Sequence, residues 1–177
     1  MTTRNLFLLI YSLIIFSYSV ENLPASDIWE SLGPEGGSIS AIACAKADTQ
    51  IIYVATGDGV YKSVNGGKSW QRSCNGLRNL SISSLAIEGN KIYAGAADGV
   101  YKSIDEGGTW ERSSEGLMDV TCLAISPTEP NVIYAAVGIT QSEIFKSMDY
   151  GESWSSVDGS LGKGRFYSIA VHPQNSD

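Results

Sequence analysis

Three aspartates have the type and setting that could support acid–base chemistry: Asp58, Asp98 and Asp119. Asp58 and Asp98 each precede a glycine in a turn between two apolar runs, and Asp119 directly precedes another apolar run. Two carboxyl groups about 5 to 10 Å apart, one acting as acid and the other as base or nucleophile, hydrolyse glycosidic bonds. Nothing in the sequence brings such a pair together. The three aspartates are therefore candidates only, and no catalytic residue is assigned.

Charged residues in the predicted connecting loops are candidates for binding. They are Arg78, Glu143 and Arg165. Glu143 ends a loop, residues 138–143, that is longer than the corresponding loops elsewhere in the chain. A scaffold needs only the residues that its repeats share, so a departure of this kind favours a ligand-binding role. The alternative is that all three are ordinary solvated loop charges.

The cysteine and histidine content predicts no metal site and no cofactor. Cys44, Cys74 and Cys122 lack the spacing of paired zinc ligands, and the single histidine, His172, precedes a proline. An odd number of cysteines also gives no complete disulfide framework. Cys44 stands where the other repeats have an aliphatic residue, which predicts a small buried hydrophobic side chain.

A ten-residue phrase that occurs three times organises the chain. It reads YKSVNGGKSW at residues 61–70, YKSIDEGGTW at 101–110 and FKSMDYGESW at 145–154, so its periods are 40 and 44 residues. Trp29 precedes the first of these phrases at nearly the same spacing, so every tryptophan belongs to the pattern. We expect the tryptophans to pack against the neighbouring sheet.

Each repeat contains four short segments with the character of β-strands. The second is rich in β-branched and aromatic residues. A turn with glycine leads to the third, which ends in Lys-Ser, and the tryptophan introduces the fourth. The first segments are residues 39–44, 82–87, 120–125 and 166–171, and the second segments are 51–56, 91–96 and 132–137.

Four antiparallel strands in about 40 residues form one blade of a β-propeller. The sequence thus predicts an all-β propeller with blades over residues 38–73, 81–114 and 119–157, and the first strand of a fourth, truncated blade within 165–177. A helical solenoid would tolerate few internal glycines, yet the first repeat alone has four. A β-solenoid is excluded less firmly, because it also uses short strands and turns.

The phrase that ends in tryptophan resembles the Asp-box, or bacterial neuraminidase repeat (BNR), written Ser-x-Asp-x-Gly-x-Thr-Trp. The resemblance implies a structural turn in which a short carboxylate or amide accepts backbone N–H groups and glycine supplies a positive φ. Calcium binding or catalysis by these aspartates is the alternative, but one carboxylate per blade does not converge on an ion. The matching residues are Ser63, Asn65, Gly67 and Trp70, then Ser103, Asp105, Gly107 and Trp110, then Ser147, Asp149, Gly151 and Trp154.

The resemblance extends to sialidase-like, sortilin-like and photosystem II assembly-factor-like propellers, and it leaves two kinds of function open. Nearly uniform blades favour a binding or scaffold module for a protein, peptide or glycan. The alternative is a glycoside hydrolase, sialidase-like or xyloglucanase-like, whose catalytic carboxylates lie partly in sequence missing from this chain. The Arg-Ile-Pro signature of sialidases is not found here.

Residues 1–19 have the profile of a signal peptide. One positive charge near the start is followed by an apolar stretch, residues 6–16, and then by small residues. This stretch is shorter than the about 20 residues that a spanning helix needs, and no other segment is long and apolar enough to span a membrane. We expect secretion after cleavage before Val20. An uncleaved N-terminal anchor is the alternative.

The net charge of −7 argues against a nucleic-acid partner, because binding to phosphates requires clustered lysine and arginine. Closed propellers usually have about four to eight blades. Three blades and one further strand therefore predict an N-terminal fragment of a larger propeller. Its partners would include the remaining blades, and Trp29 would belong to the last strand of an earlier or closing blade.

Overall fold

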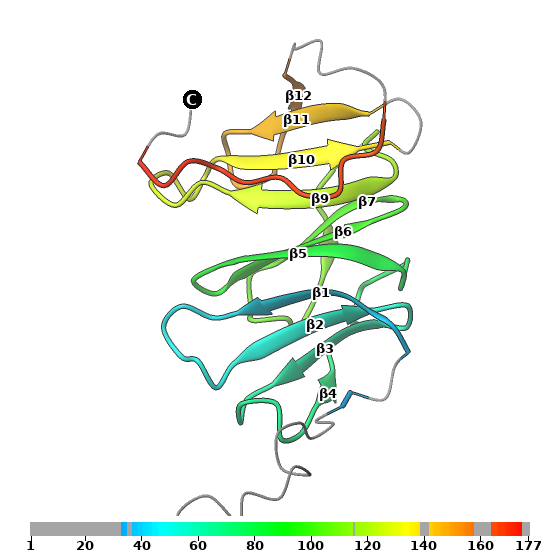
Figure 1. Cartoon of the computed structure of the whole chain (residues 1–177), viewed down its shortest axis with the longest axis vertical. Coiled ribbons are helices and arrows are strands. Elements are labelled where there is room, and N and C mark those ends of the chain that lie inside the picture. Colours follow the sequence, from blue (N-terminus) through cyan, green and yellow to red (C-terminus); the bar gives the residue numbers. More distant parts are fainter. Residues whose placement is uncertain (1–32, 35–36, 115, 139–141, 158–163, 175–177) are drawn as a thin grey trace, which may run out of the picture. The chain divides into compact units, whose positions relative to one another are not determined.

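The described part of the chain folds into three four-stranded antiparallel sheets (Figure 1). The structure, a computed structural model, describes residues 33–34, 37–114, 116–138, 142–157 and 164–174. The predicted signal peptide and Trp29 lie outside the described residues. Within them, no helix is long and apolar enough to cross a membrane. The all-β fold predicted from the repeats is confirmed.

Each sheet is one blade, and its strands pair in chain order. Blade 1 contains β1 (Ile39–Cys44), β2 (Ile52–Thr56), β3 (Gly59–Ser63) and β4 (Gln71–Arg72). Blade 2 contains β5 (Ile82–Glu88), β6 (Lys91–Ala96), β7 (Gly99–Ser103) and β8 (Glu111–Arg112). Blade 3 contains β9 (Val120–Ile125), β10 (Ile133–Val137), β11 (Glu143–Ser147) and β12 (Ser155–Ser156).

The same register recurs in the second and third strands of all three blades. A tyrosine of the second strand lies opposite the lysine of the Lys-Ser pair in every case, namely Tyr53 and Lys62, Tyr93 and Lys102, and Tyr134 and Lys146. Because a shift by one residue would move every side chain to the other face, this shared register gives each blade the same pair of faces.

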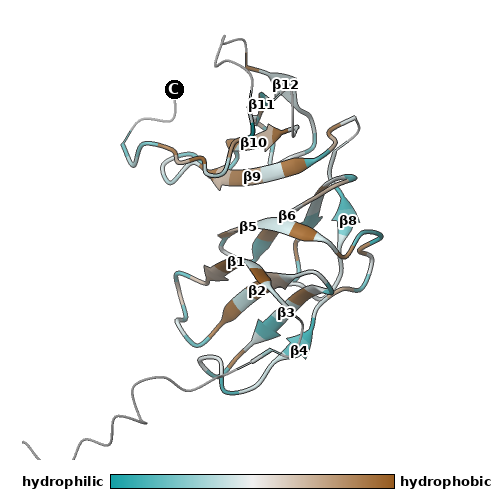
Figure 2. Cartoon of the chain, turned by 45° about the vertical axis from the view of Figure 1, so that its right-hand side comes forward, coloured by the Kyte–Doolittle hydropathy of each residue, from teal (hydrophilic) through white to brown (hydrophobic). Residues whose placement is uncertain are grey.

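Apolar side chains pack between successive blades. The first cluster joins Tyr53, Ala55 and Val60 of blade 1 to Ile82 and Leu85 of blade 2, with further residues of blade 2 around them. The second cluster repeats this arrangement between blades 2 and 3. Figure 2 shows the apolar residues on β2, β5 and β9 that belong to these packed sheets.

The loops divide between the two ends of the strands. At one end, which we call the Asp-box rim, the N–H of Gly66 donates to the carbonyl of Gln50 at 3.0 Å, and the equivalent bonds recur in blades 2 and 3. The other end, the connection rim, carries the turns between second and third strands and the connections between blades. There the Asp119 N–H donates to the Ala97 carbonyl at 2.8 Å, as expected from the blade topology.

Residues 164–174 form no strand, although the sequence predicts one over 166–171. The segment follows β9 in Figure 1, and the Cys122 thiol donates to the Phe166 carbonyl at 3.4 Å. The reason lies in the pairing: a first strand pairs only with the second strand of its own blade, as β1 does with β2. No such second strand follows Phe166 among the described residues.

The expectation of a buried Cys44 was wrong, because this side chain is exposed. Cys44 lies at the end of β1, whose apolar residues are less covered than those of the other first strands. Ile42 is 63% exposed, whereas Leu85 and Leu123 at the same position are 9% and 7% exposed. The difference arises because β5 and β9 each pack against a preceding blade, and no described residue packs in that way on β1.

Candidate functional site

The Asp-box turn of blade 2 is closed by its own side chains. Ser103 Oγ accepts the Gly107 N–H and donates to Asp105 Oδ1, both at 2.8 Å. Asp105 in turn accepts the backbone N–H and the hydroxyl of Thr109 at 2.8 and 2.7 Å. These hydrogen bonds, led by that of the Thr109 N–H, lower the pKa of Asp105 to about 2. Asp105 is therefore an ionised acceptor that stabilises the turn.

The other two copies repeat the turn with different residue types. In blade 3, Asp149 accepts the backbone N–H of Ser153 at 2.9 Å, and its hydrogen bonds, led by that of the Ser153 hydroxyl, lower its pKa. In blade 1, Asn65 Oδ1 accepts the Ser69 N–H at 2.9 Å. An amide thus replaces the carboxylate without loss of the backbone contact, which fits a structural turn better than an acid–base group.

In blades 2 and 3, the tryptophan that follows the Asp-box turn donates a hydrogen bond to the preceding blade. Trp110 is only 4% exposed, and its indole N–H donates to the Ser73 carbonyl of blade 1 at 2.9 Å. Trp154 donates to the Ser113 carbonyl of blade 2 at 3.0 Å. Gly107, with φ +84°, lies so close to blade 1 that an added Cβ would come within 2.5 Å of Ser73 Oγ.

Metal-binding residue types do not cluster in the described parts of either rim. Among the described residues, no group of three or more histidine, cysteine, aspartate or glutamate side chains is arranged to hold a metal ion. The two Asp-box carboxylates, Asp105 and Asp149, lie in different blades and accept hydrogen bonds from local donors.

Asp58 on the connection rim is held within its own blade. Its carboxylate accepts Arg72 Nη2 at 2.9 Å on Oδ1 and the Tyr61 hydroxyl at 3.1 Å on Oδ2. The same Arg72 nitrogen also donates to the Asp58 carbonyl at 2.9 Å. The charge of Asp58 raises the pKa of Arg72, and its hydrogen bond to the phenol raises the pKa of Tyr61.

Asp98 occupies the equivalent turn of blade 2 but is paired differently. Oδ2 accepts the Tyr101 hydroxyl at 2.7 Å, and Arg112 donates to the Asp98 carbonyl. Oδ1 is buried and has no hydrogen-bond partner among the described residues. A buried acceptor without a partner costs about 1–3 kcal/mol, so this oxygen requires an explanation. Burial raises the pKa of Tyr101.

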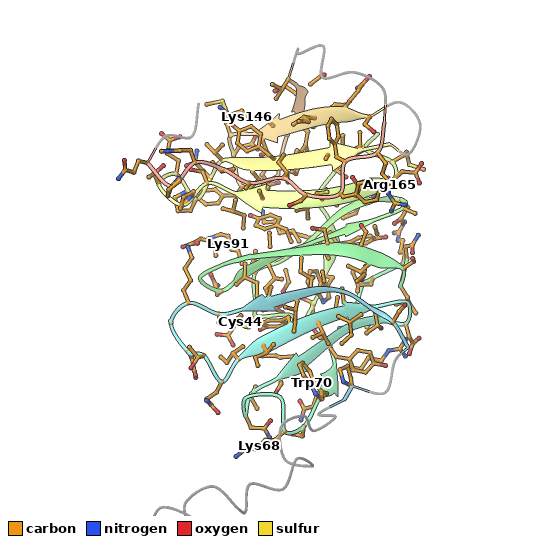
Figure 3. The ribbon with its side chains drawn as sticks, viewed as in Figure 1. Cys44, Lys68, Trp70, Lys91, Lys146 and Arg165 are labelled. Atoms are coloured by element: carbon orange, nitrogen blue, oxygen red, sulfur yellow. The ribbon has the colours of Figure 1, made fainter. Side chains whose placement is uncertain are left out.

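The remaining candidates from the sequence are Asp119, Glu143 and Arg165. Asp119 is exposed in the connection to blade 3, with φ +53°, and its carbonyl accepts the Gly138 N–H at 3.0 Å. Glu143 is exposed at the start of β11. Arg165 lies at the connection rim, at the opposite ends of the strands from Lys91 and Lys146 (Figure 3), and its guanidinium lies 5.6 Å from the centre of the Tyr167 ring. Among the described residues, no hydrogen bond joins any two of Asp58, Asp98 and Asp119.

Arg78, one of the binding candidates from the sequence, borders a cavity. One cavity of about 530 Å³ lies between the connection that follows blade 1 and the outer strand β8 of blade 2, and a second of about 420 Å³ shares two of its residues, Arg78 and Arg112. We call the two together the perimeter cleft. Its lining residues are Gly76, Leu77, Arg78, Tyr101, Trp110, Glu111, Arg112, Ser113, Ser114 and Glu152.

Among the residues that the structure describes, the two arginines of the perimeter cleft have no carboxylate partner. The four ion pairs among the described residues use Lys46, Lys62, Arg72 and Lys102 as cations. Arg78 is exposed, and Arg112 donates only to a backbone carbonyl. The cleft therefore presents two guanidinium groups whose remaining donors are available, on a chain with net charge −7.

Sequence reasoning missed Arg112 and Tyr101. The signal was present, because the phrase Asp-Gly-Val-Tyr-Lys-Ser occurs at residues 58–63 and again at 98–103, and an arginine follows each tryptophan by two positions in blades 1 and 2. This repetition indicates that blades 1 and 2 share a contact between the aspartate turn and the arginine. It does not reveal that Arg72 donates to the Asp58 carboxylate, whereas Asp98 Oδ1 has no hydrogen-bond partner among the described residues.

Comparison with known proteins places the fold. No protein-family model and no curated protein matches the chain. Among solved structures, an ancestral GH74 enzyme is similar over 84% of this chain, with 25% sequence identity and a TM-score of 0.70. The extracellular domain of a putative hybrid two-component system from B. thetaiotaomicron matches over 81%, with 17% identity and a TM-score of 0.62.

A third similar structure is YCF48 bound to D1 peptide, which matches over 67% of this chain with 14% identity and a TM-score of 0.55. The chain spans 22% of the GH74 structure, 19% of the two-component-system domain and 40% of the YCF48 chain. The chain thus has a β-propeller repeat fold, as its repeats predict.

Proposed function

We propose that this chain is an exported β-propeller binding module whose perimeter cleft holds a peptide segment of a partner protein. The observation that carries the proposal is the pair of arginines, Arg78 and Arg112, which line both cavities and have no carboxylate partner among the described residues. Peptide binding by YCF48, a propeller of similar fold, supports a peptide as the ligand class.

A glycan suits the perimeter cleft less well than a peptide. Sugar rings commonly stack on exposed aromatic faces, because these faces are flat and apolar. The two aromatic residues of the cleft, Tyr101 and Trp110, are 0% and 4% exposed. Backbone and side-chain groups of a peptide can use the guanidinium and carboxylate groups of the cleft without such a face.

The proposal is tested by selecting peptides on the full chain from a display library of random linear peptides. We expect the selected peptides to bind saturably with one site per chain. Substitution of both arginines, Arg78→Gln with Arg112→Gln, should abolish that binding while the thermal unfolding curve keeps its cooperativity. Failure to select any peptide, or binding that the double substitution leaves intact, would contradict the proposal.

A glycoside hydrolase is the second candidate, because the GH74 enzyme has a higher sequence identity to this chain than the two-component-system domain and YCF48 have. Its carboxylates would be drawn from Asp58, Asp98 and Asp119. The assay is hydrolysis of xyloglucan and of a fluorogenic sialoside by the full chain. Activity that is lost in Asp98→Ala or Asp119→Ala would favour this candidate over the binding module.

Export and further blades complete the proposal. Cleavage after residue 19 would release a chain that begins at Val20, and mass spectrometry of the N-terminal peptide from a secreting host tests this directly. A mature protein that still carries residues 1–19 would instead support the N-terminal anchor. The remaining blades of a larger propeller are proposed as further partners of the described blades.

A further inference from the structure

Blades 1 and 2 contain the same aspartate–arginine pair in two different states. Arg72 donates to both the carbonyl and the carboxylate of Asp58 at 2.9 Å. Arg112 donates to the Asp98 carbonyl alone, and Asp98 Oδ1 is buried without a partner among the described residues. The arginine therefore binds the carboxylate of its aspartate in blade 1 but not in blade 2.

The pair in blade 1 shows what a guanidinium at this position binds. In blade 1 a carboxylate oxygen lies 2.9 Å from Arg72 Nη2, which is the distance of a charge-assisted hydrogen bond. Arg72 also borders a cavity, of about 280 Å³, but its charge is already paired there. At Arg112 the carboxylate of the same blade does not take this place, so the guanidinium has no carboxylate partner among the described residues and can bind one from a ligand.

Arg78 adds a second guanidinium at the same cleft. It lies in the connection from blade 1 to blade 2, where the corresponding residue of the next connection is Met118. Among the described residues, only the boundary between blades 1 and 2 has an arginine at both positions. Each guanidinium presents several N–H donors in one plane, and this geometry matches the two oxygens of a carboxylate.

We propose that the perimeter cleft recognises a single acidic side chain of the bound peptide, whose carboxylate takes at Arg112 the place that Asp58 takes at Arg72. The inference rests on the proposed peptide-binding function and names its specificity. Glu111 lines the first cavity and has no ion-pair partner among the described residues, and Asp98 accepts the hydroxyl of Tyr101, which lines the same cavity. These two carboxylates repel a run of acidic residues, so the preferred peptide has one aspartate or glutamate among neutral neighbours.

The test compares two dye-labelled octapeptides of glycine and serine, N-acetylated and C-amidated, that differ only in one central glutamate or glutamine. Fluorescence anisotropy is recorded at low salt with the full chain at up to about 1 mM, a range that detects weak complexes. We expect the glutamate peptide to bind about tenfold more tightly than the glutamine peptide, because only a carboxylate forms charge-assisted hydrogen bonds with guanidinium groups. Arg112→Gln and Arg78→Gln should each remove most of this preference.

Arg72→Gln is the matched control, because its guanidinium is already occupied by Asp58. We expect this variant to keep the full preference. Arg112→Lys provides a second variant at the site: it keeps the charge but loses the planar fork, so the preference should fall to an intermediate value. Thermal unfolding of every variant shows whether it is folded.

The outcomes separate this inference from the function on which it rests. If display-selected peptides bind but glutamate and glutamine peptides bind equally, the acidic specificity is wrong and peptide binding stands. If Arg72→Gln reduces the preference as much as Arg112→Gln does, the assignment to the perimeter cleft is wrong. If neither the selected peptides nor the two octapeptides bind, the proposed function itself fails.

Discussion

The two rims of the blades differ in how closely they repeat. On the Asp-box rim, serine, an aspartate or asparagine, and glycine make the same local hydrogen bonds in blades 1, 2 and 3. On the connection rim, Asp58 and Asp98 occupy equivalent turns but bind their arginines differently. The third blade has a longer connection there, and it lacks both aspartate and arginine at the corresponding positions.

This difference separates what holds the blades together from what distinguishes them. The repeated turn carries the tryptophan that reaches the preceding blade, so a change there disturbs packing between blades. The charged side chains of the connection rim and of the adjoining perimeter cleft can vary because they lie outside the two apolar clusters. Function in this chain is therefore expected where the repeats depart from one another.

The largest effect is expected from removing a tryptophan of the Asp-box rim. Trp110→Ala should lower the free energy of unfolding by about 3–5 kcal/mol, because the side chain is nearly fully buried and its indole N–H binds the preceding blade. Denaturant unfolding measures this loss. Trp154→Ala is the comparison, and its half-buried side chain predicts a smaller loss. Equal and small losses for both would contradict the packing role of the repeated turn.

A smaller effect is expected at the ion pairs between blades. Lys102 is 8% exposed as a side chain and pairs with Glu152 of blade 3, whereas Lys62 is 21% exposed and pairs with Glu106 of blade 2. Glu152→Gln should cost about 1 kcal/mol, because it leaves a more buried ammonium without its counter-charge. Glu106→Gln should cost about 0.5 kcal/mol or less. Thermal unfolding of the two variants gives the order, and the reverse order would contradict the burial argument.

Acid should weaken the turns of blades 2 and 3 but not that of blade 1. The pKa of Asp105 is lowered to about 2, and that of Asp149 is also lowered. A lowered folded-state pKa gives stability that is present above the unfolded value of about 3.9 and is lost as the pH falls toward the folded value. Melting temperatures between about pH 5 and pH 2 should therefore fall, and Asp105→Asn should make that fall shallower. An unchanged pH profile in Asp105→Asn would contradict the assignment.

The smallest effect is expected at a position where the two blades use different atoms for the same contact. Cys74 Sγ accepts the Val60 N–H at 3.3 Å, and Ser114 Oγ accepts the Val100 N–H at 2.9 Å. Cys74→Ser should therefore change the stability by less than about 0.5 kcal/mol. Cys74→Val, which removes the acceptor at similar volume, should destabilise the fold more. A loss in Cys74→Ser as large as that in Cys74→Val would mean that the thiol has another role.

The sequence predicts the repeated part of the fold well because its cues are local. The Asp-Gly turns, the tyrosine-bearing second strand and the spacing of tryptophans all act within one blade, and β6 begins and ends where the sequence predicts. The segment after Gly164 was predicted less well, because a strand exists only where a partner strand pairs with it. Residues 166–171 have strand-like composition and no such partner among the described residues.

The candidate site was predictable only in part. Arg78 follows from its place in a connecting loop, and Asp58 and Asp98 follow from their turns. Arg112 could not be separated from Arg72, because both follow a tryptophan at the same distance and precede a serine. Which arginine pairs with the carboxylate of its aspartate depends on the side-chain geometry of the two turns, which their identical local motifs do not distinguish.

The most direct test of the difference between blades 1 and 2 on the connection rim is NMR of the arginine side chains. The Nε–Hε signals of Arg72, Arg78 and Arg112 are assigned in the full chain by single substitutions and followed while the glutamate octapeptide is added. The account predicts that the signals of Arg78 and Arg112 shift together and saturably, and that the Arg72 signal stays in place. Movement of the Arg72 signal alone, or no movement of any of the three by a peptide that binds, would contradict it.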